Sequence, residues 1–146
     1  MKKNKFFIIL IVLITVVFVS GCGKSQEQTQ ADVSIQDAWA RPANQGDNGA
    51  AFFTIQSKGD DTLLSAESSV AQAVELHKTE MEGEVMKMMP QTEGVQIPSG
   101  TTEFKPGGLH VMLINLKQKL VLGETFDLTL NFKNAGPKTI QVTIQQ

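Results

Sequence analysis

The sequence predicts an all-β protein, an antiparallel sandwich or barrel assembled from several short strands. Three observations support this fold class. Apolar and polar residues alternate with a period of two in several segments, clusters of Gly, Pro, Asn and Asp separate those segments, and helical periodicity is scarce. Cys22 is the single cysteine, so no disulfide within the chain stabilises the fold. Stability therefore depends on the apolar core.

The first strands are expected near the start of the polar part of the chain. Residues 33–39 suggest a first strand and residues 50–55 (AAFFTI) a second, followed by a turn at residues 57–61 (SKGDD). Residues 63–73 are rich in Ser and Ala and have the least regular pattern. A short helical turn is expected there.

A β-hairpin is expected in the middle of the chain. Residues 74–77 and 85–89 flank a turn at Glu82 and Gly83, and Pro90 ends the second strand. The hairpin matters because one of its strands ends in a histidine and the other contains three methionines.

The C-terminal half has the most regular strand patterns. Residues 95–97 form a short run before a proline, and residues 109–116 follow a Pro-Gly-Gly turn. Residues 126–132 and 140–144 alternate strictly between apolar and polar side chains, with a Gly-Pro turn between them. Such strands bury one face only.

The N-terminus has the features of a secretory signal. Three lysines precede an apolar run over residues 6–19, which is short for a membrane span, and the run ends in Val-Ser-Gly-Cys, which resembles a bacterial lipobox. We therefore expect a signal peptide at 1–21, a segment 22–31 that comprises the lipidated Cys22 and a flexible polar tether, and one domain at 32–146. An uncleaved anchor helix and a free N-terminal thiol are the alternatives.

The charge of the mature chain argues against nucleic-acid binding. Without the signal lysines, ten basic residues face 15 acidic ones, a formal net charge near −5. A nucleic-acid-binding domain normally has a basic surface.

The signal sequence and Cys22 together predict an extracytoplasmic location, with the protein anchored by lipid to the bacterial membrane.

Histidine and methionine are placed unusually in this sequence. His110 and Met112 lie two residues apart in a predicted strand, so both point to the same face. The other histidine, His77, ends a predicted strand. The predicted partner strand of the hairpin carries Met86 and Met88 on one face and Met89 on the other. Three short elements could thus converge on one point.

This donor set favours a soft metal ion. Imidazole nitrogen and thioether sulfur suit Cu(I) better than Zn²⁺, whereas Ca²⁺ and Mg²⁺ require oxygen ligands. Thiolates are poor permanent ligands outside the cytoplasm because they oxidise, and thioethers resist oxidation better. The residues alone leave open whether the methionines bind a metal or form an apolar patch for a protein partner.

The spacing of these residues resembles that of a known family. His77, Met88, His110 and Met112 fit H-x10-M-x21-H-x-M, the signature of the periplasmic copper chaperones called PCuAC. The flanking segments Ala38 to Pro42, Val74 to His77 and Phe104 to His110 also resemble the family's motifs, and the similarity extends roughly from Val33 to Ile144.

The resemblance implies a fold, a cargo and a partner. The fold would be a cupredoxin-like β-sandwich of Greek-key type, with one Cu(I) ion bound by His77, Met88, His110 and Met112. The acceptor would be a membrane cuproenzyme, namely cytochrome c oxidase, whose subunit II would receive the copper at its Cu(A) site. Lys78 replaces the methionine that often follows the first histidine of the motif, and the C-terminus lacks the His/Met-rich tail that binds Cu(II) in some members.

Neighbouring residues have further expected roles. Met86 is the substitute ligand should Met88 not bind, and Met81 and Met89 are expected to be packing or rim residues. Trp39 is expected in the core, and Arg41 in an ion pair or facing a partner. At the predicted hairpin tip, Glu80, Glu82 and Glu84 are expected to be solvated charges, and the alternative is an acidic rim that favours the approach of a cation.

Other classes of function fit less well. An electron-transfer cupredoxin needs a cysteine ligand that the domain does not have to spare, and no nucleophile and base pair indicates an enzyme. The main alternative is a structural or protein-interaction lipoprotein with a methionine-rich patch.

Overall fold

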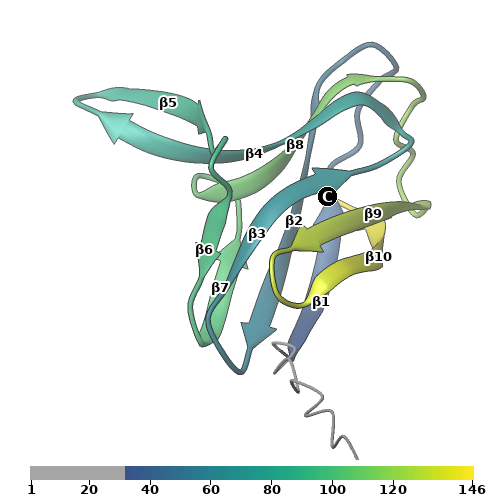
Figure 1. The fold of residues 1–146 in the computed structure, drawn as a ribbon. Helices are drawn as coiled ribbons and strands as arrows, with labels where there is room; N and C mark the ends of the chain where they lie inside the picture. The colour runs from purple at the N-terminus through teal and green to yellow at the C-terminus, as the bar shows by residue number, and fades with distance from the viewer. Residues whose placement is uncertain (1–31) are drawn as a thin grey trace, which may run out of the picture.

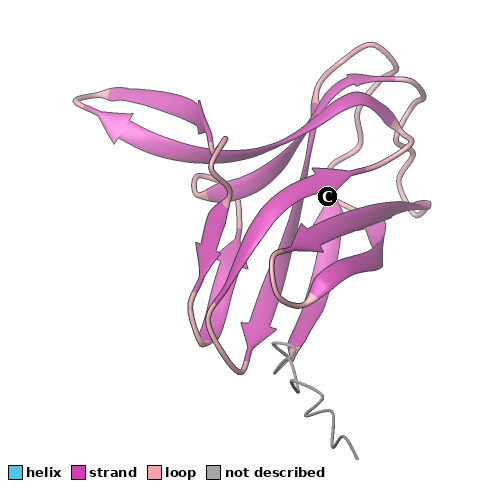
Figure 2. Ribbon diagram, viewed as in Figure 1, coloured by secondary structure: helices cyan, strands magenta, loops and turns pink. Residues whose placement is uncertain are grey.

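The computed structural model describes residues 32–146, and every regular element in this part of the chain is a β-strand (Figure 1, Figure 2). The predicted signal peptide, Cys22 and the tether lie outside the described residues. None of residues 32–146 belongs to a helix long and apolar enough to cross a membrane. The strands of the described part are β1 (Val33–Ala40), β2 (Gly49–Ser57), β3 (Asp61–Glu67), β4 (Ala71–Glu82), β5 (Val85–Pro90), β6 (Val95–Ile97), β7 (Gly100–Phe104), β8 (Leu109–Leu116), β9 (Thr125–Phe132) and β10 (Gly136–Ile144).

The strands form one continuous hydrogen-bonded sheet that folds back on itself. Their order is β5-β4-β8-β7-β2-β1-β10-β9-β3-β6, and β8 also pairs with β2. Strands β3 and β4 are seven places apart in this order but lie in contact, so the two halves of the sheet enclose a core. The predicted all-β fold is confirmed. Its pairings are antiparallel except for β1 with β10 and β7 with β8, which are parallel.

The core lies between the two halves and consists of the inward faces of alternating strands. In β2 the inward residues are Ala51, Phe53 and Ile55, and in β8 they are Val111 and Leu113. Phe53 stacks on Phe104 of β7 with ring centroids 4.5 Å apart. Because the inward residues of β8 are odd-numbered, its even-numbered residues in this stretch face away from the core.

A bulge in β1 changes which residues face inward. Asp37 has a φ of 52°, and the pairing of β1 with β2 shifts register between Gln36 and Trp39. The extra residue explains why the apolar pattern of this strand changes parity after Ile35. Trp39 is consequently half-buried on the outer face against Phe52, rather than in the core as predicted from sequence.

The segment 63–73 contains no helical turn, so this expectation from the sequence was wrong. Its first residues complete β3 and its last ones begin β4. The register of β3 against β9 shifts between Leu63 and Ser65, which breaks the period-two pattern. Strand β7 was not predicted at all, because Phe104 is its only apolar residue and the strand therefore shows no apolar–polar alternation.

The buried carboxylate of Asp61 fixes the connection between β9 and β10. Its oxygens accept hydrogen bonds from the backbone N–H groups of Asn134 and Ala135, both at 2.9 Å, and of Thr62 at 2.7 Å. A buried carboxylate needs such donors because its desolvation is unfavourable.

Strand β4 is long enough to leave the body of the sheet. Its pairing with β8 ends at Lys78, whereas its pairing with β5 continues to Glu82 opposite Val85. The outer part of β4 and β5 therefore forms a two-stranded ribbon that extends away from the other strands (Figure 1). Gly83, with a φ of 66°, lies in the two-residue turn at its tip.

Candidate metal centre

The two histidines lie directly opposite each other on neighbouring strands. In the antiparallel pair β4 and β8, His77 is the partner of His110, and Glu75 is the partner of Met112. Directly paired residues point to the same face, and so do residues two apart on one strand. All four side chains are therefore on the face of the sheet that is turned away from the core.

His110 is held with one ring nitrogen available. The residue is 5 % exposed, and its Nδ1 lies 3.0 Å from the carbonyl oxygen of Gly108. Since a carbonyl only accepts, Nδ1 carries the proton and Nε2 keeps its lone pair. The same carbonyl accepts a hydrogen bond from the N–H of Thr79 in β4, which connects the turn before β8 to the hairpin. The turn itself requires Gly107, whose φ is 78°.

His77 is held with the opposite ring nitrogen available. Its Nε2 lies 2.8 Å from Oε2 of Glu75, two residues earlier on the same face of β4. The carboxylate accepts, so Nε2 is the protonated nitrogen. The Nδ1 of His77 is buried and has no hydrogen-bond partner in the structure. A buried nitrogen lone pair without a donor is unusual and is what a metal-binding imidazole requires.

The distance between the two rings fits a single shared ion. Their centroids are 5.8 Å apart with an interplanar angle of 48°. A metal–nitrogen bond is about 2 Å, and the nitrogen lies roughly 1 Å from the ring centre, so two imidazoles on one ion have centroids about 5–6 Å apart. The observed spacing lies in this range.

Two predicted thioether ligands border the same pocket as His110. The pocket has a volume of about 400 Å³ and includes Met88 of β5 and Met112 of β8 in its lining. Ala50, the partner of Met112 on β2, also lines the pocket, and its small side chain leaves space there. His77 does not line the pocket but lies behind His110 with 12 % of its side chain exposed.

The position of Met88 follows from the register of the hairpin. Met88 is the partner of Thr79, two residues beyond His77, so it lies on the histidine face of the ribbon. Met86 is the partner of Met81, two pairs farther out along the ribbon, and does not line the pocket. The structure thus brings three of the four predicted ligands to one pocket, places His77 beside His110, and leaves Met86 outside.

Two aromatic rings form a row beside His110 on the outer face of the sheet. Phe52 of β2 is buried although it does not belong to the main core, and its ring lies 6.4 Å from that of His110. Trp39 packs on the other side of Phe52 at 4.7 Å. These rings restrict the orientation of the imidazole. Phe52 was missed in the sequence analysis, although it is two residues from Ala50 on the outward face of a predicted strand.

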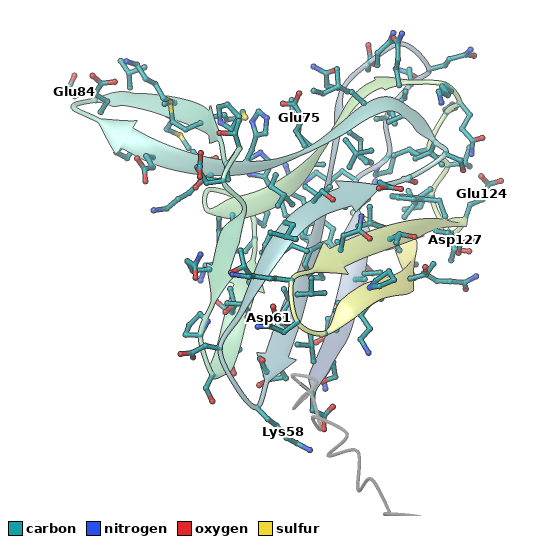
Figure 3. All side chains as sticks on the ribbon, viewed as in Figure 1. Lys58, Asp61, Glu75, Glu84, Glu124 and Asp127 are labelled. Carbon is teal, nitrogen blue, oxygen red and sulfur yellow. The ribbon has the colours of Figure 1, made fainter. Side chains whose placement is uncertain are left out.

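The remaining residues singled out from the sequence are at the rim. Arg41 is exposed and lines the pocket, and no carboxylate within residues 32–146 forms an ion pair with it. Met81 and Met89 are exposed, so of their two expected positions, in the packing or at the rim, the rim agrees with the structure. Figure 3 shows sulfur atoms along the hairpin, between Glu75 near its base and Glu84 at its tip.

The acidic rim is partly neutralised by lysines. Glu80 forms an ion pair with Lys78 at 2.8 Å, and Glu82 forms one with Lys87. The strand register places these four residues on the ribbon face opposite the histidines. Within residues 32–146, no three His, Cys, Asp or Glu side chains gather closely enough to hold a metal ion. The candidate centre is therefore defined by imidazole and thioether donors.

Comparison with known proteins identifies the family. The family described as "Putative lipoprotein LpqE-like" matches residues 33–144, which comprise all ten strands. This chain belongs to the LpqE-like family. It is also similar to the "Putative lipoprotein Lxx21020" of Leifsonia xyli, at 33% identity over 120 residues, covering 80% of this chain and 72% of the relative. A protein of Rickettsia prowazekii, RP573, is 28% identical over 122 residues, covering 79% and 67%.

Solved structures confirm the resemblance to the PCuAC family. The copper-bound PCuAC domain from PmoF2 superposes with a TM-score of 0.62 at 20% identity, covering 77% of this chain and 92% of that domain. At this identity the match shows the cupredoxin-like fold alone. The Cu(I) form of DR1885 from Deinococcus radiodurans is 29% identical, with a TM-score of 0.55 over 76% of this chain and 78% of that one. The LpqE-like chain thus has a fold similar to that of PCuAC domains.

Proposed function

We propose that this protein is an extracytoplasmic metallochaperone that binds one Cu(I) ion and carries it to a membrane cuproenzyme. The ligands are His77, Met88, His110 and Met112. The solved relative DR1885, in its Cu(I) form, supports the choice of ion. The chemistry of this chain supports it independently, because two neutral imidazoles and two thioethers form a soft donor set that suits a monovalent ion.

The observation that carries this proposal is the complementary state of the two histidines. His77 presents Nδ1 because its Nε2 is hydrogen-bonded, and His110 presents Nε2 because its Nδ1 is hydrogen-bonded. The centroids of the two rings are 5.8 Å apart. Ordinary structural histidines satisfy both ring nitrogens when they are buried. Here the free lone pairs lie on one face, next to a pocket that contains two methionines.

The positions of the ligands suggest how the ion leaves. His110 is buried and supported by Phe52, whereas Met88 is 58 % exposed on the ribbon. We infer an associative exchange in which a ligand of the acceptor bonds to Cu(I) as the bond to the Met88 thioether breaks. The copper remains Cu(I) throughout, so neither electrons nor protons are transferred. The role is that of a carrier and not of an enzyme.

The acceptor and the anchor are finer parts of the proposal. The acceptor is the Cu(A) site of cytochrome c oxidase subunit II, as the resemblance to PCuAC implies. The family's description as lipoproteins supports lipidation at Cys22. Two acyl chains suffice for stable anchoring, and the anchor raises the effective concentration of the carrier near a membrane-bound acceptor.

An anaerobic Cu(I) titration against a chromophoric chelator tests metal binding. A soluble chain from Gly23 onward retains all ten described strands and is suitable for this measurement. We expect one equivalent of Cu(I) bound tightly by the parent, and loss of that binding in the His110→Ala, Met112→Ala variant. Met89→Leu, an exposed methionine on the opposite face of the ribbon, is the matched control and should bind as the parent does.

A second candidate function is a protein-interaction lipoprotein with an apolar patch. The observation that favours it is the exposure of Val85 and Met89 on the ribbon, where neither residue faces the histidines. Thermal unfolding separates the two functions. Cu(I) at about 100 times its Kd should stabilise a native-state binder by about 2.7 kcal/mol, whereas an interaction module without a metal site should not respond.

A further inference from the structure

The outer part of the ribbon carries methionines that the four-ligand centre does not use. Beyond Lys78, strand β4 pairs with no described strand except β5. Met81 and Met86 are partners there and are 63 % and 62 % exposed. Side chains this exposed contribute little to folding, so a packing role in the core does not explain them.

These methionines share one face with the histidine centre. Met81 lies four residues after His77 on β4, and Met86 lies two residues before Met88 on β5. All of these positions point to the same side of the ribbon because side chains alternate along a strand. From the histidines outward, this face carries Thr79 opposite Met88 and then Met81 opposite Met86.

The register brings three thioethers within reach of one ion. Directly paired residues such as Met81 and Met86 have Cβ atoms about 4.5–5.5 Å apart, and a diagonal neighbour such as Met88 is about 7–8 Å away. Methionine has three rotatable side-chain bonds, and on this exposed ribbon nothing in the core restrains them. The sulfur atoms can therefore converge without a change in the backbone.

The two faces of the ribbon differ in chemistry. The opposite face carries two Lys–Glu ion pairs, in addition to Val85 and Met89. On the histidine face, the pair beyond Thr79 and Met88 consists of two methionines, Met81 and Met86. Leucine or isoleucine would be sufficient for a surface that serves only as an apolar contact. A soft metal ion, in contrast, requires soft donors such as thioether sulfur.

We propose that Met81, Met86 and Met88 form a second, outer Cu(I) site made of thioethers only. Met88 belongs to both sites, so the ion can pass between them without leaving the protein. Two of the bonds to His77, His110 and Met112 break as bonds to Met81 and Met86 form, the third then breaks without replacement, and the three-coordinate ion stays Cu(I). The outer site binds more weakly than the inner one because its ligands are exposed and none is an imidazole.

The relay rests on the proposed function, but the outer site itself does not. The two are separated by a His77→Ala, His110→Ala variant, which lacks both imidazoles of the inner site. Cu(I) is added anaerobically as its acetonitrile complex to the chain from Gly23 onward, labelled with ¹³C at the methionine methyl groups. We expect the methyl resonances of Met81, Met86 and Met88 to shift together, while that of Met89 stays in place.

A shift of Met89 equal to that of the other three would mean nonspecific contact with Cu(I), and the outer site would be rejected. The absence of any shift would reject it as well. If the parent shows the same three shifts and binds Cu(I) no more tightly than the double-histidine variant, the proposed inner site fails and the outer site stands.

A leucine substitution tests the relay against a docking patch. Leucine keeps the apolar surface but removes the sulfur donor, so Met81→Leu, Met86→Leu should leave Cu(I) affinity at the inner site unchanged and slow Cu(I) transfer to a competing chelator several-fold. Met89→Leu should transfer at the parental rate. Equal transfer rates in the parent and the double-leucine variant would refute the relay and leave an apolar contact surface as the use of this face.

Discussion

Removing the carboxylate of Glu75 should weaken copper binding without disturbing the fold. Glu75 accepts a hydrogen bond from Nε2 of His77 at 2.8 Å and thereby leaves Nδ1 as the free nitrogen. In Glu75→Ala the imidazole loses this partner, so it can rotate and exchange tautomers. The fraction of molecules that present Nδ1 to the ion then falls.

The size of the effect follows from the exposure of Glu75. Residues that hold a metal-binding histidine contribute about 10–100-fold to metal affinity. The side chain of Glu75 is 48 % exposed, so water can replace part of its function and the lower end of the range applies. We expect about a tenfold loss, or ~1.4 kcal/mol, for Glu75→Ala. Glu75→Gln keeps an acceptor without the charge and should lose only about threefold.

Competitive Cu(I) titration measures both variants, and ¹⁵N shifts of the His77 ring report its tautomer directly. Glu80→Ala is the matched control, because Glu80 is an exposed glutamate of the same strand on the opposite face. Its affinity for Cu(I) should equal that of the parent. A rise in affinity in Glu75→Ala would refute the reasoning, since it would mean that the carboxylate competes with copper for Nε2.

Three further predictions concern the fold. Leu113→Ala removes a side chain that is fully buried in the core and should cost about 3–4 kcal/mol in urea denaturation; a loss below 1 kcal/mol would contradict the assigned core. Asp61→Ala removes the acceptor of three backbone N–H groups and should cost about 2–4 kcal/mol; an unchanged midpoint would count against this role. Lys58 holds the pKa of Asp32 below its usual range through a hydrogen bond and its charge, so Lys58→Met should raise that pKa in an NMR titration. A carboxyl group whose pKa is lowered in the folded protein stabilises the fold at pH values above its unfolded pKa, and the parent should lose this contribution as the pH falls through the folded pKa. An unchanged pKa of Asp32 in the variant would rule out the pairing.

Local patterns in the sequence were sufficient for most of the strands and for the ligand candidates. Strands β9 and β10 alternate strictly, and the pair His110 and Met112 follows from the rule that residues two apart share a face. The same rule, applied to His77, would have identified Glu75 as a neighbour on its face. That signal was present in the sequence but was not used.

Other features depend on contacts between distant segments. The bulge at Leu63 and Ser65 breaks the alternation of β3, so a local pattern could not reveal this strand. The parallel pairing of β1 with β10 joins the two ends of the domain and has no local signature. The hydrogen bond that selects Nε2 of His110 as the free nitrogen requires the turn at Gly108 to be folded.

The projecting β4–β5 ribbon should open locally more often than the rest of the sheet. A two-stranded hairpin has little intrinsic stability in water, and this one lacks a core beneath its outer half. Its amide hydrogens should therefore exchange by local opening, with a much smaller free energy than those of β8, which lies between β4 and β2 or β7. Copper held by Met88 would join the two regions and slow exchange in the ribbon. The amides of β5 would then report, one by one, whether the carrier is loaded.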